Sequence, residues 1–247
     1  MMSKQRSGRG GLVWAIVGGL VLVAGIVAII VTAIVSPPTP SSTPTPGSTA
    51  GAGASSAPEP PAPTGVFVDP AATERGWTPE PITTDPEIYI RAALETASTF
   101  DATKSSREEW LDYLDTWFTP DTRYASEADQ TAAMKASQVE MRQGVVLPQE
   151  DWDSLAGEDG RVVARSTGGI AFVPVAEDPS GGMSIGTADV TLTFTRSDGS
   201  GKESSYDETV RVSVQVLCGP GSVPTPDTAQ HAGDCKVVRY FTEPLEP

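Results

Sequence analysis

The hydrophobic pattern of this chain has three parts: one unbroken apolar run, a region of helical period and a region of strict alternation. The unbroken run covers residues 12–35 and contains no charged side chain. At ~1.5 Å of rise per residue, a helix of this length reaches ~36 Å and can cross a hydrocarbon layer of ~30 Å. The pattern therefore predicts a transmembrane helix over residues 12–35. A cleaved secretory signal is the alternative, but its apolar core is usually only ~7–15 residues long.

The charges that flank the run predict its orientation. Lys4, Arg6 and Arg9 precede it, whereas the first charged residue after it is Glu59. Positively charged flanks are retained on the cytoplasmic side of a membrane. We therefore expect residues 1–11 to form a cytoplasmic tail and the C-terminal part to be an extracytoplasmic domain of a single-pass cell-membrane protein.

A change of composition follows the apolar run. Residues 36–64 contain nine prolines among Ser, Thr, Ala and Gly, with a single charge. Such a segment cannot bury enough apolar surface to offset its ordering entropy. We predict a disordered stalk over residues 36–80 and a folded domain over residues 81–247. Phe67 and Trp77 leave two interpretations of residues 65–80 open, a strap that contacts the domain or further linker.

The first half of the domain has the 3.6-residue period of helices. Asp85 before a proline predicts a helix that runs to about residue 100. Ser106 with Glu109 is a capping-box pattern for a second helix, which ends near residue 119. Thr119 before a proline predicts a third helical segment that ends before residue 144. The apolar residues of the second helix share one face: Trp110, Leu111, Leu114, Trp117 and Phe118.

From about residue 160 the period changes from 3.6 to 2. Val190, Leu192 and Phe194, for example, alternate with threonines, as in a strand with one buried and one solvated face. Strands are predicted over residues 161–165, 169–175, 185–196, 203–217 and 236–242, with a hairpin loop at 197–201. Two to three helices followed by a curved antiparallel sheet predict an α+β fold class.

The net charge of the domain restricts its partners. Beyond residue 63 the chain carries fourteen basic and thirty-one acidic side chains, a net charge of −17. A nucleic-acid surface needs clustered Lys and Arg, and anionic lipid headgroups attract the same residues. Neither nucleic acid nor an anionic lipid surface is therefore an expected partner of the domain.

Two cysteines lie at the end of one predicted strand and the start of the next. Antiparallel neighbours bring Cys218 and Cys235 together, and thiols outside the cytoplasm are usually oxidised. A structural disulfide that closes the loop 219–234 is predicted. A redox-active pair is disfavoured because CxxC spacing is absent.

One motif resembles a hydrolase nucleophile. Residues 182–186 match G-x-S-x-G around Ser184, and His231 follows with Asp207 or Asp227 between them. That motif requires a strand before the serine and a helix after it, whereas here a turn precedes and a Thr/Val-rich strand follows. A chance match is favoured, so no catalytic residue is assigned.

Metal and cofactor patterns are equally weak. Glu150, Asp151 and Asp153 form the densest acidic cluster, but they lack calcium-loop spacing, and a solvated turn is favoured. No phosphate-binding glycine motif occurs, so no metal site and no cofactor is predicted. Two groups on the second helix are interpreted as its wet face and its core face. The first is Glu108, Glu109, Asp112 and Asp115, and the second is Trp110, Tyr113, Trp117 and Phe118.

Residues 88–124 carry a family resemblance. A small-residue first helix, a short polar break and an E-E-W-L-x-x-L second helix that ends at Thr-Pro resemble the opening of cystatin-like domains of the nuclear transport factor 2-like superfamily. The stretch is similar in particular to actinobacterial proteins with an N-terminal membrane anchor. These include bitopic components of conjugative and type IV secretion machines and membrane proteins associated with lipid import. The resemblance implies a cone of helices on a curved sheet, and it transfers no site residue.

Two hypotheses for function follow from the anchor, the stalk and the resemblance. The first is a non-catalytic, single-pass scaffold that contacts other subunits of a cell-envelope secretion or transfer complex. Association with further copies of itself is a second expected interaction of such a scaffold. The second is a module that binds a lipid or other small apolar molecule between the first helix and the sheet. A hydrolase that uses Ser184 is the third and least favoured hypothesis.

Overall fold

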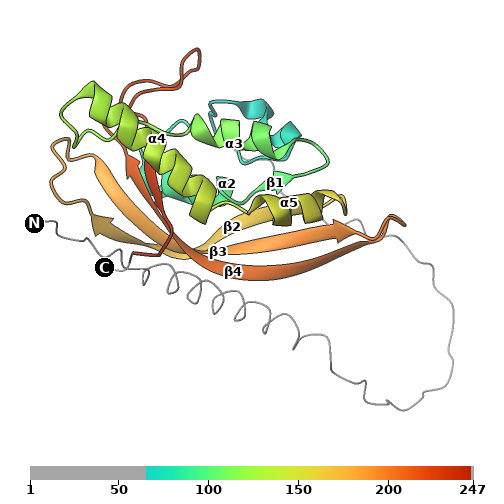
Figure 1. Cartoon of the computed structure of the whole chain (residues 1–247). Coiled ribbons are helices and arrows are strands. Elements are labelled where there is room, and N and C mark those ends of the chain that lie inside the picture. Colours follow the sequence, from blue (N-terminus) through green and yellow to red (C-terminus); the bar gives the residue numbers. More distant parts are fainter. Residues whose placement is uncertain (1–64, 246–247) are drawn as a thin grey trace, which may run out of the picture. The chain divides into compact units, whose positions relative to one another are not determined.

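The computed structural model describes residues 65–245. In this part of the chain, four α-helices and a short 3-10 helix lie on one side of a curled antiparallel sheet (Figure 1). The helices are η1 (Pro70–Arg75), α2 (Pro86–Thr96), α3 (Arg107–Asp115), α4 (Glu127–Gly144) and α5 (Gln149–Ala156). The α+β prediction is confirmed, with four α-helices in the described residues where two to three were expected.

The predicted cytoplasmic tail, the transmembrane helix over residues 12–35 and the stalk up to residue 64 lie outside the described residues. Within residues 65–245, every helix is too short or too polar to cross a bilayer.

Helices α2 and α3 begin where their capping patterns predict. The Asp85 carboxylate accepts hydrogen bonds from the backbone N–H groups of Glu87 and Ile88. Ser106 and Glu109 form the complete capping box. Both helices end earlier than predicted, because the chain turns into the short strand β1 (Phe100–Asp101) after α2 and leaves the helical path after Asp115 in α3.

Helix α4 begins later than predicted. Its N-cap is Ser126, whose hydroxyl accepts a hydrogen bond from Asp129 N–H, so the predicted start at Thr119 is wrong. Thr119 instead donates its backbone N–H to the carbonyl of Val237 at 2.8 Å. Its hydroxyl accepts a hydrogen bond from the N–H of Val223 at 2.9 Å. These long-range bonds hold the segment extended, and a helix there would break them.

Helix α5 was not predicted. The acidic cluster Glu150, Asp151 and Asp153, expected to be a solvated turn, lies in this helix, with the first two residues in its first turn. Carboxylates are favoured at that position by the helix dipole. Trp152 and Leu155 supply the buried side of the helix. The prediction failed because only two apolar side chains mark the pattern.

The sheet is a meander in which each strand pairs with the next along the chain. Its strands are β1, β2 (Arg161–Pro174), β3 (Met183–Ser197), β4 (Glu203–Leu217) and β5 (Lys236–Phe241), all antiparallel. The two strands predicted at 161–165 and 169–175 are one strand with a bulge between Thr167 and Ala171. Gly168 takes φ +69° there, which glycine adopts without strain.

Strand β4 does not have one buried and one wet face along its whole length, as its alternating valines predict. Residues 203–211 are exposed on both faces, whereas residues 213–217 are buried on both. β5 pairs only with residues 213–217, so it covers the edge of the buried part alone. On the face away from α2, Leu245 N–H also donates to the Ser213 hydroxyl, and the Thr187 hydroxyl donates to the Leu245 carbonyl.

Residues 65–84 form a strap that packs on the domain. Phe67 pairs with Pro81 in an isolated β-bridge. Trp77 is 3 % exposed and stacks on Tyr113 with ring centroids 4.8 Å apart. The first of the two interpretations of residues 65–80 therefore holds, because these residues pack on the domain, and the packed part of the described chain includes residues before 81.

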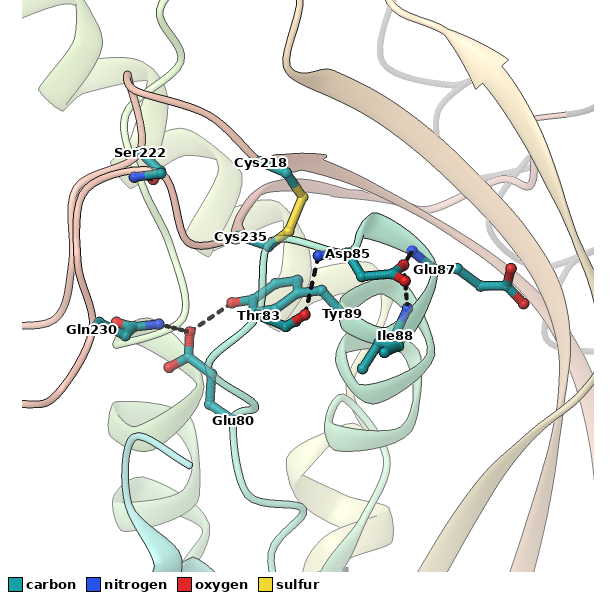
Figure 2. The surroundings of a disulfide bond; sticks show 11 residues. Glu80, Thr83, Asp85, Glu87, Ile88, Tyr89, Cys218, Ser222, Gln230 and Cys235 are labelled. Carbon is teal, nitrogen blue, oxygen red and sulfur yellow. Dashed lines mark hydrogen bonds between the residues drawn. A yellow bond between two sulfur atoms is a disulfide. The ribbon is translucent and has the colours of Figure 1, made fainter. Parts of the chain in front are cut away.

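The predicted disulfide joins Cys218 to Cys235 and closes the loop 219–234 (Figure 2). Its surroundings tie the loop to the strap, because Cys235 N–H donates to the carbonyl of Thr83 at 2.8 Å. Thr83 in turn accepts a hydrogen bond from Asp85 N–H through its hydroxyl. The bridge therefore lies beside the start of α2 and holds strap, helix and sheet at one place.

Candidate functional site

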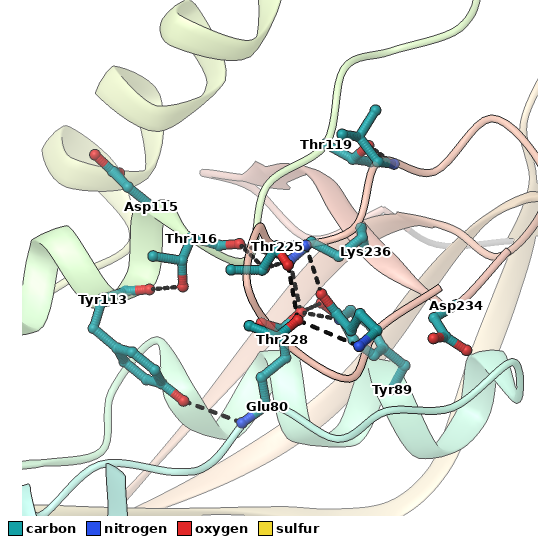
Figure 3. A network of polar contacts seen from close by, with 12 residues as sticks. Glu80, Tyr89, Tyr113, Asp115, Thr116, Thr119, Thr225, Thr228, Asp234 and Lys236 are labelled. Atoms are coloured by element: carbon teal, nitrogen blue, oxygen red, sulfur yellow. Dashed lines mark hydrogen bonds and ion pairs between the residues drawn. The ribbon is translucent and has the colours of Figure 1, made fainter. Parts of the chain in front are cut away.

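A buried ion pair lies at the centre of the polar interior (Figure 3). The Lys236 ammonium, 1 % exposed, donates to the carboxylate of Glu80, 0 % exposed, over 2.9 Å. It also donates to the Thr116 carbonyl at 2.6 Å and to the Thr225 hydroxyl at 2.8 Å. These three acceptors satisfy the three donors of an ammonium group.

The same Glu80 oxygen accepts two further hydrogen bonds. The Tyr89 hydroxyl donates to it over 2.6 Å and the Gln230 amide over 3.1 Å. Together with Lys236, these bonds join the strap, α2, the disulfide loop and β5. Glu80 N–H also donates to the Tyr113 hydroxyl on α3. Four segments therefore meet at the Glu80 carboxylate, and a fifth, α3, binds the backbone of the same residue.

Burial changes the acidity of both charged groups. It raises the pKa of the Glu80 carboxyl above its ordinary value, although the nearby Lys236 charge opposes that shift. Burial also lowers the pKa of the Lys236 ammonium. Both directions show that desolvation outweighs the mutual attraction. The sequence holds no signal for this pair, because 156 positions separate its members. We interpret it as a structural tie.

The hydrolase constellation is not assembled. The Ser184 hydroxyl on β3 is buried and has no hydrogen-bond partner among the described residues. Ser184 pairs with Val216, whereas Asp207 lies nine residues away along β4, ~30 Å at strand rise. His231 is exposed in the disulfide loop, where its backbone N–H binds the Asp234 carboxylate. Asp227 belongs to the same loop, and among residues 65–245 no base forms a hydrogen bond with the Ser184 hydroxyl.

The other groups singled out in the sequence have structural roles. Within residues 65–245, no three His, Cys, Asp or Glu side chains are arranged to hold a metal ion. The aromatic group on the second helix is core, as predicted. Trp110 contacts Trp152 of α5, and Trp117 contacts Tyr89 of α2. Asp115 forms an ion pair with Arg142 of α4, so one residue of the predicted wet face lies against another helix.

The outer edge of β2 is covered as far as Gly168, first by β1 and then by side chains. Its backbone N–H groups at Ala164 and Ser166 donate to Thr99 and Glu95, over 3.0 Å in each case. Further along, Arg91 of α2 donates to the carbonyl of Gly168, again at 3.0 Å. These bonds satisfy backbone groups that would otherwise accept another strand.

The outer edge of β4 is open over more than half its length. Among residues 65–245, no strand pairs with the outer side of β4 before Ser213. This part belongs to the β3–β4 hairpin, whose tip projects past α5 (Figure 1). The two edges of the described sheet therefore differ, because no strand among residues 65–245 covers the edge of β4 before Ser213.

Apolar side chains accompany the open edge on the face that carries the helices. Tyr206 is 45 % exposed and stacks on Phe194 of β3, with ring centroids 5.0 Å apart and an interplanar angle of 5°. Val210 is also exposed, opposite Val190. Next to Phe194 lies a pocket of about 260 Å³ between the sheet and the segment that joins α4 to α5. Its apolar lining includes Phe100, Val145, Val146, Leu147, Val162, Leu192 and Phe194.

The space between α2 and the sheet, where a ligand was predicted to bind, is filled at its centre. A Cβ added to Gly186 of β3 would lie 2.7 Å from Ile90 of α2 and 2.9 Å from Ile170. Only glycine lets the helix approach this closely. The pocket beside Phe194 lies at a different place in the fold.

Comparisons with known proteins give two structural neighbours. No protein-family model matches the chain, and no curated protein matches its sequence. An IcmL-like type IV secretion system protein from Legionella pneumophila is 12 % identical, with 64 % of this chain and 88 % of that one covered and a TM-score of 0.38. CagV, a VirB8 homolog from Helicobacter pylori, is 17 % identical, with 54 % and 78 % covered and a TM-score of 0.30.

Proposed function

We propose that this protein is a non-catalytic, single-pass assembly component of a secretion or transfer complex in the cell envelope. Residues 12–35 anchor it in the cell membrane, residues 1–11 face the cytoplasm, and the domain beyond the stalk contacts other subunits outside the membrane. The anchor and its orientation come from the apolar run and its flanking charges.

The observation that carries the assembly role is the difference between the two edges of the sheet. Side chains from α2 and the segment after it cover the β2 edge as far as Gly168. Residues 203–211 of β4, in contrast, are exposed, and among residues 65–245 no strand pairs with their outer edge. Soluble domains usually protect such an edge. An open edge beside exposed Tyr206 and Val210 favours a surface that another protein covers.

The secretion setting is part of the proposal. The IcmL-like protein and the VirB8 homolog belong to type IV secretion systems. Similarity at TM-scores of 0.38 and 0.30 carries no weight, so the proposal depends on the open sheet edge, the predicted anchor and the resemblance of residues 88–124.

Protein or DNA transfer by the host cell tests the role. A strain without the gene is complemented with the full chain or with a chain whose residues 1–35 are replaced by a cleavable secretion signal. We expect the full chain to restore transfer and the released domain, matched in amount and folded, to fail. Unchanged transfer in the strain without the gene would refute the assembly role.

The topology has its own test. A reporter that is active only outside the cytoplasm, fused after Pro247, should be active, and the protein should fractionate with membranes. A mature N-terminus that begins after Val35 would show that residues 12–35 are a removed signal and not an anchor.

The pocket beside Phe194 supports a second candidate function, the binding of a small apolar molecule or a lipid chain. Its volume of about 260 Å³ and its apolar lining suit an acyl segment. Native mass spectrometry of the full-length protein should then detect a bound lipid that is lost when Leu192→Trp fills the pocket. Identical spectra for both proteins would refute lipid binding.

A further inference from the structure

The open edge of β4 presents a regular row of backbone groups. The hairpin is closed by a hydrogen bond from Asp198 N–H to the Lys202 carbonyl at 3.1 Å. In an antiparallel pair, hydrogen-bonded and non-bonded positions alternate. Even-numbered residues of β4 therefore bond to β3, and the odd-numbered residues from Glu203 to Arg211 direct their N–H and C=O groups outward. Nine consecutive residues thus offer a template for another strand.

The edge lacks several of the devices by which sheets prevent strand addition. Residues 203–211 contain no proline and no lysine, and the β3–β4 register runs from Met183 to Ser197 without a bulge. Proline, inward-pointing charges, bulges and short edge strands are the usual protections. Proline and bulges are absent from this edge and the strand is long, whereas Asp207 and Glu208 place negative charge on it. A strand that pairs here must therefore neutralise these two carboxylates.

Two carboxylates determine which strand fits. Asp207 and Glu208 are neighbours on β4 and so lie on opposite faces. Asp207 accepts a hydrogen bond from the Thr193 hydroxyl at 2.7 Å, and Glu208 stands opposite Leu192. Among the described residues, neither has an ion-pair partner. Elsewhere on the same strand, Glu203 pairs with Arg161, which makes the middle of the edge the negative part.

Segments of this chain fit the edge poorly. Residues 36–64 contain no Lys or Arg, and prolines remove the N–H groups that strand pairing needs. A second copy that pairs residues 203–211 antiparallel with their own counterparts would place Asp207 directly opposite Asp207. Like charges that are directly opposite destabilise a strand pair. The net charge of −17 beyond residue 63 adds general repulsion between copies.

We propose that β4 binds an extended basic segment of another protein by strand addition. The segment pairs with the outward backbone groups of residues 203–211. It places one Lys or Arg opposite Asp207 on one face and another opposite Glu208 on the other. Its apolar side chains lie against Tyr206 and Val210, on the same face as Glu208. This inference rests on the proposed assembly role and names the chemistry of the partner.

Two matched peptides test the proposal by fluorescence anisotropy with the full-length protein in detergent micelles. One contains Val-Thr-Lys-Lys-Val-Thr, which in antiparallel pairing places its lysines opposite Asp207 and Glu208 and its valines opposite Tyr206 and Val210. The other contains Val-Thr-Glu-Glu-Val-Thr, and both have blocked ends. We expect the lysine peptide to bind at least tenfold more tightly than the glutamate peptide. Its affinity should fall as the salt concentration is raised. Equal binding of both peptides, or no binding of the lysine peptide, would overturn the proposal.

Substitutions separate edge pairing from charge. Thr209→Pro removes an outward N–H without changing the hydrogen bonds to β3, and it should lower the affinity for the lysine peptide at least tenfold. Thr209→Ala keeps that N–H, and its affinity for the lysine peptide should be unchanged. Asp207→Asn with Glu208→Gln should abolish the preference for lysine over glutamate and keeps the proposal testable if the proline variant does not fold. Equal peptide affinity in Thr209→Pro and Thr209→Ala, both folded by circular dichroism, would overturn strand addition.

The basic-partner proposal and the assembly role on which it rests can fail separately. Sedimentation of the full-length protein measures whether it forms a dimer. A dimer that Thr209→Pro disrupts, together with no binding of the lysine peptide, would identify a second copy as the occupant and overturn the basic partner. Failure of the peptide titration leaves the transfer assay as an independent test of the assembly role. If the lysine peptide binds but transfer is unchanged in the strain without the gene, the assembly role alone is refuted.

Discussion

Lys236→Met should destabilise the domain strongly. The substitution keeps an unbranched stem and removes the ammonium that binds Glu80, Thr116 and Thr225. The Glu80 carboxylate, which is 0 % exposed, then loses the cation that pairs with it. Removing one partner of a buried ion pair costs about 3–5 kcal/mol. At about 2–4 °C per kcal/mol for a domain of this size, the melting temperature should fall by roughly 6–20 °C.

The loss should depend on pH in a specific direction. Burial already raises the pKa of the folded-state Glu80 carboxyl above its ordinary value of 4.5, and loss of the Lys236 charge raises it further. A carboxyl with a higher pKa in the folded state binds its proton more tightly there. Stability is therefore lost as pH rises from about 4.5 through the folded-state pKa. The deficit of Lys236→Met should be smallest in acid and grow toward neutral pH.

Urea denaturation followed by circular dichroism, at several pH values between acid and neutral, measures this effect. Lys135→Met, on the exposed side of α4, is the matched control and should change stability by less than about 0.5 kcal/mol. Glu80→Gln added to Lys236→Met removes the stranded charge and should recover part of the loss. A deficit below about 1 kcal/mol, or one that does not change with pH, would refute a buried ion pair at this place.

Three further predictions concern the strap and the bridge. Replacement of Cys218 and Cys235 by Ser should cost about 3 kcal/mol, and both thiols should react with alkylating reagents only after reduction; reaction beforehand would contradict the bridge. Trp77→Ala should cost about 3–5 kcal/mol, against less than about 0.5 kcal/mol for exposed Val66→Ala; similar losses in a melting experiment would show that the strap is not packed. A chain that begins at residue 65 should be soluble and folded, whereas one that begins at residue 81 loses Trp77 and Glu80 and should unfold; equal stability of the two would restore the boundary at residue 81.

Features that depend on neighbouring residues could be predicted from the sequence. The starts of α2 and α3 are decided by Asp85 and by the Ser106–Glu109 pair, each within one helical turn. The disulfide follows from two cysteines at facing ends of adjacent strands. In each case the stabilising bonds join residues close in sequence or adjacent in a meander.

Features that depend on contacts between residues far apart in the sequence could not be predicted. Thr119 has a residue type suited to a helix cap, but bonds to Val223 and Val237 hold it extended. Trp77 lies in a proline-rich segment that composition favours as linker, and its contact with Tyr113 decides otherwise. The tertiary contacts of these residues outweigh local propensity.

The open edge shows the same limit at the candidate site. Alternating valines predict β4 as a strand, but they do not predict that only its last part, residues 213–217, is paired with β5. That outcome depends on the length of β5, which ends at Phe241, opposite Ser213. The motif around Ser184 was visible in the sequence, yet the structure brings no partner to it among the described residues.

The tie at Glu80 and the open edge occupy opposite ends of β4. Lys236 pairs with Leu217 at the strand's C-terminal end, and Thr209 lies eight residues away, ~26 Å at strand rise. The strap joins the domain at the same end as Lys236, since the Thr83 carbonyl accepts a hydrogen bond from the N–H of Cys235. Effects of substitutions this far apart, without shared partners, usually add. The buried network can therefore fix the strap to the domain while residues 203–211 remain accessible to a partner.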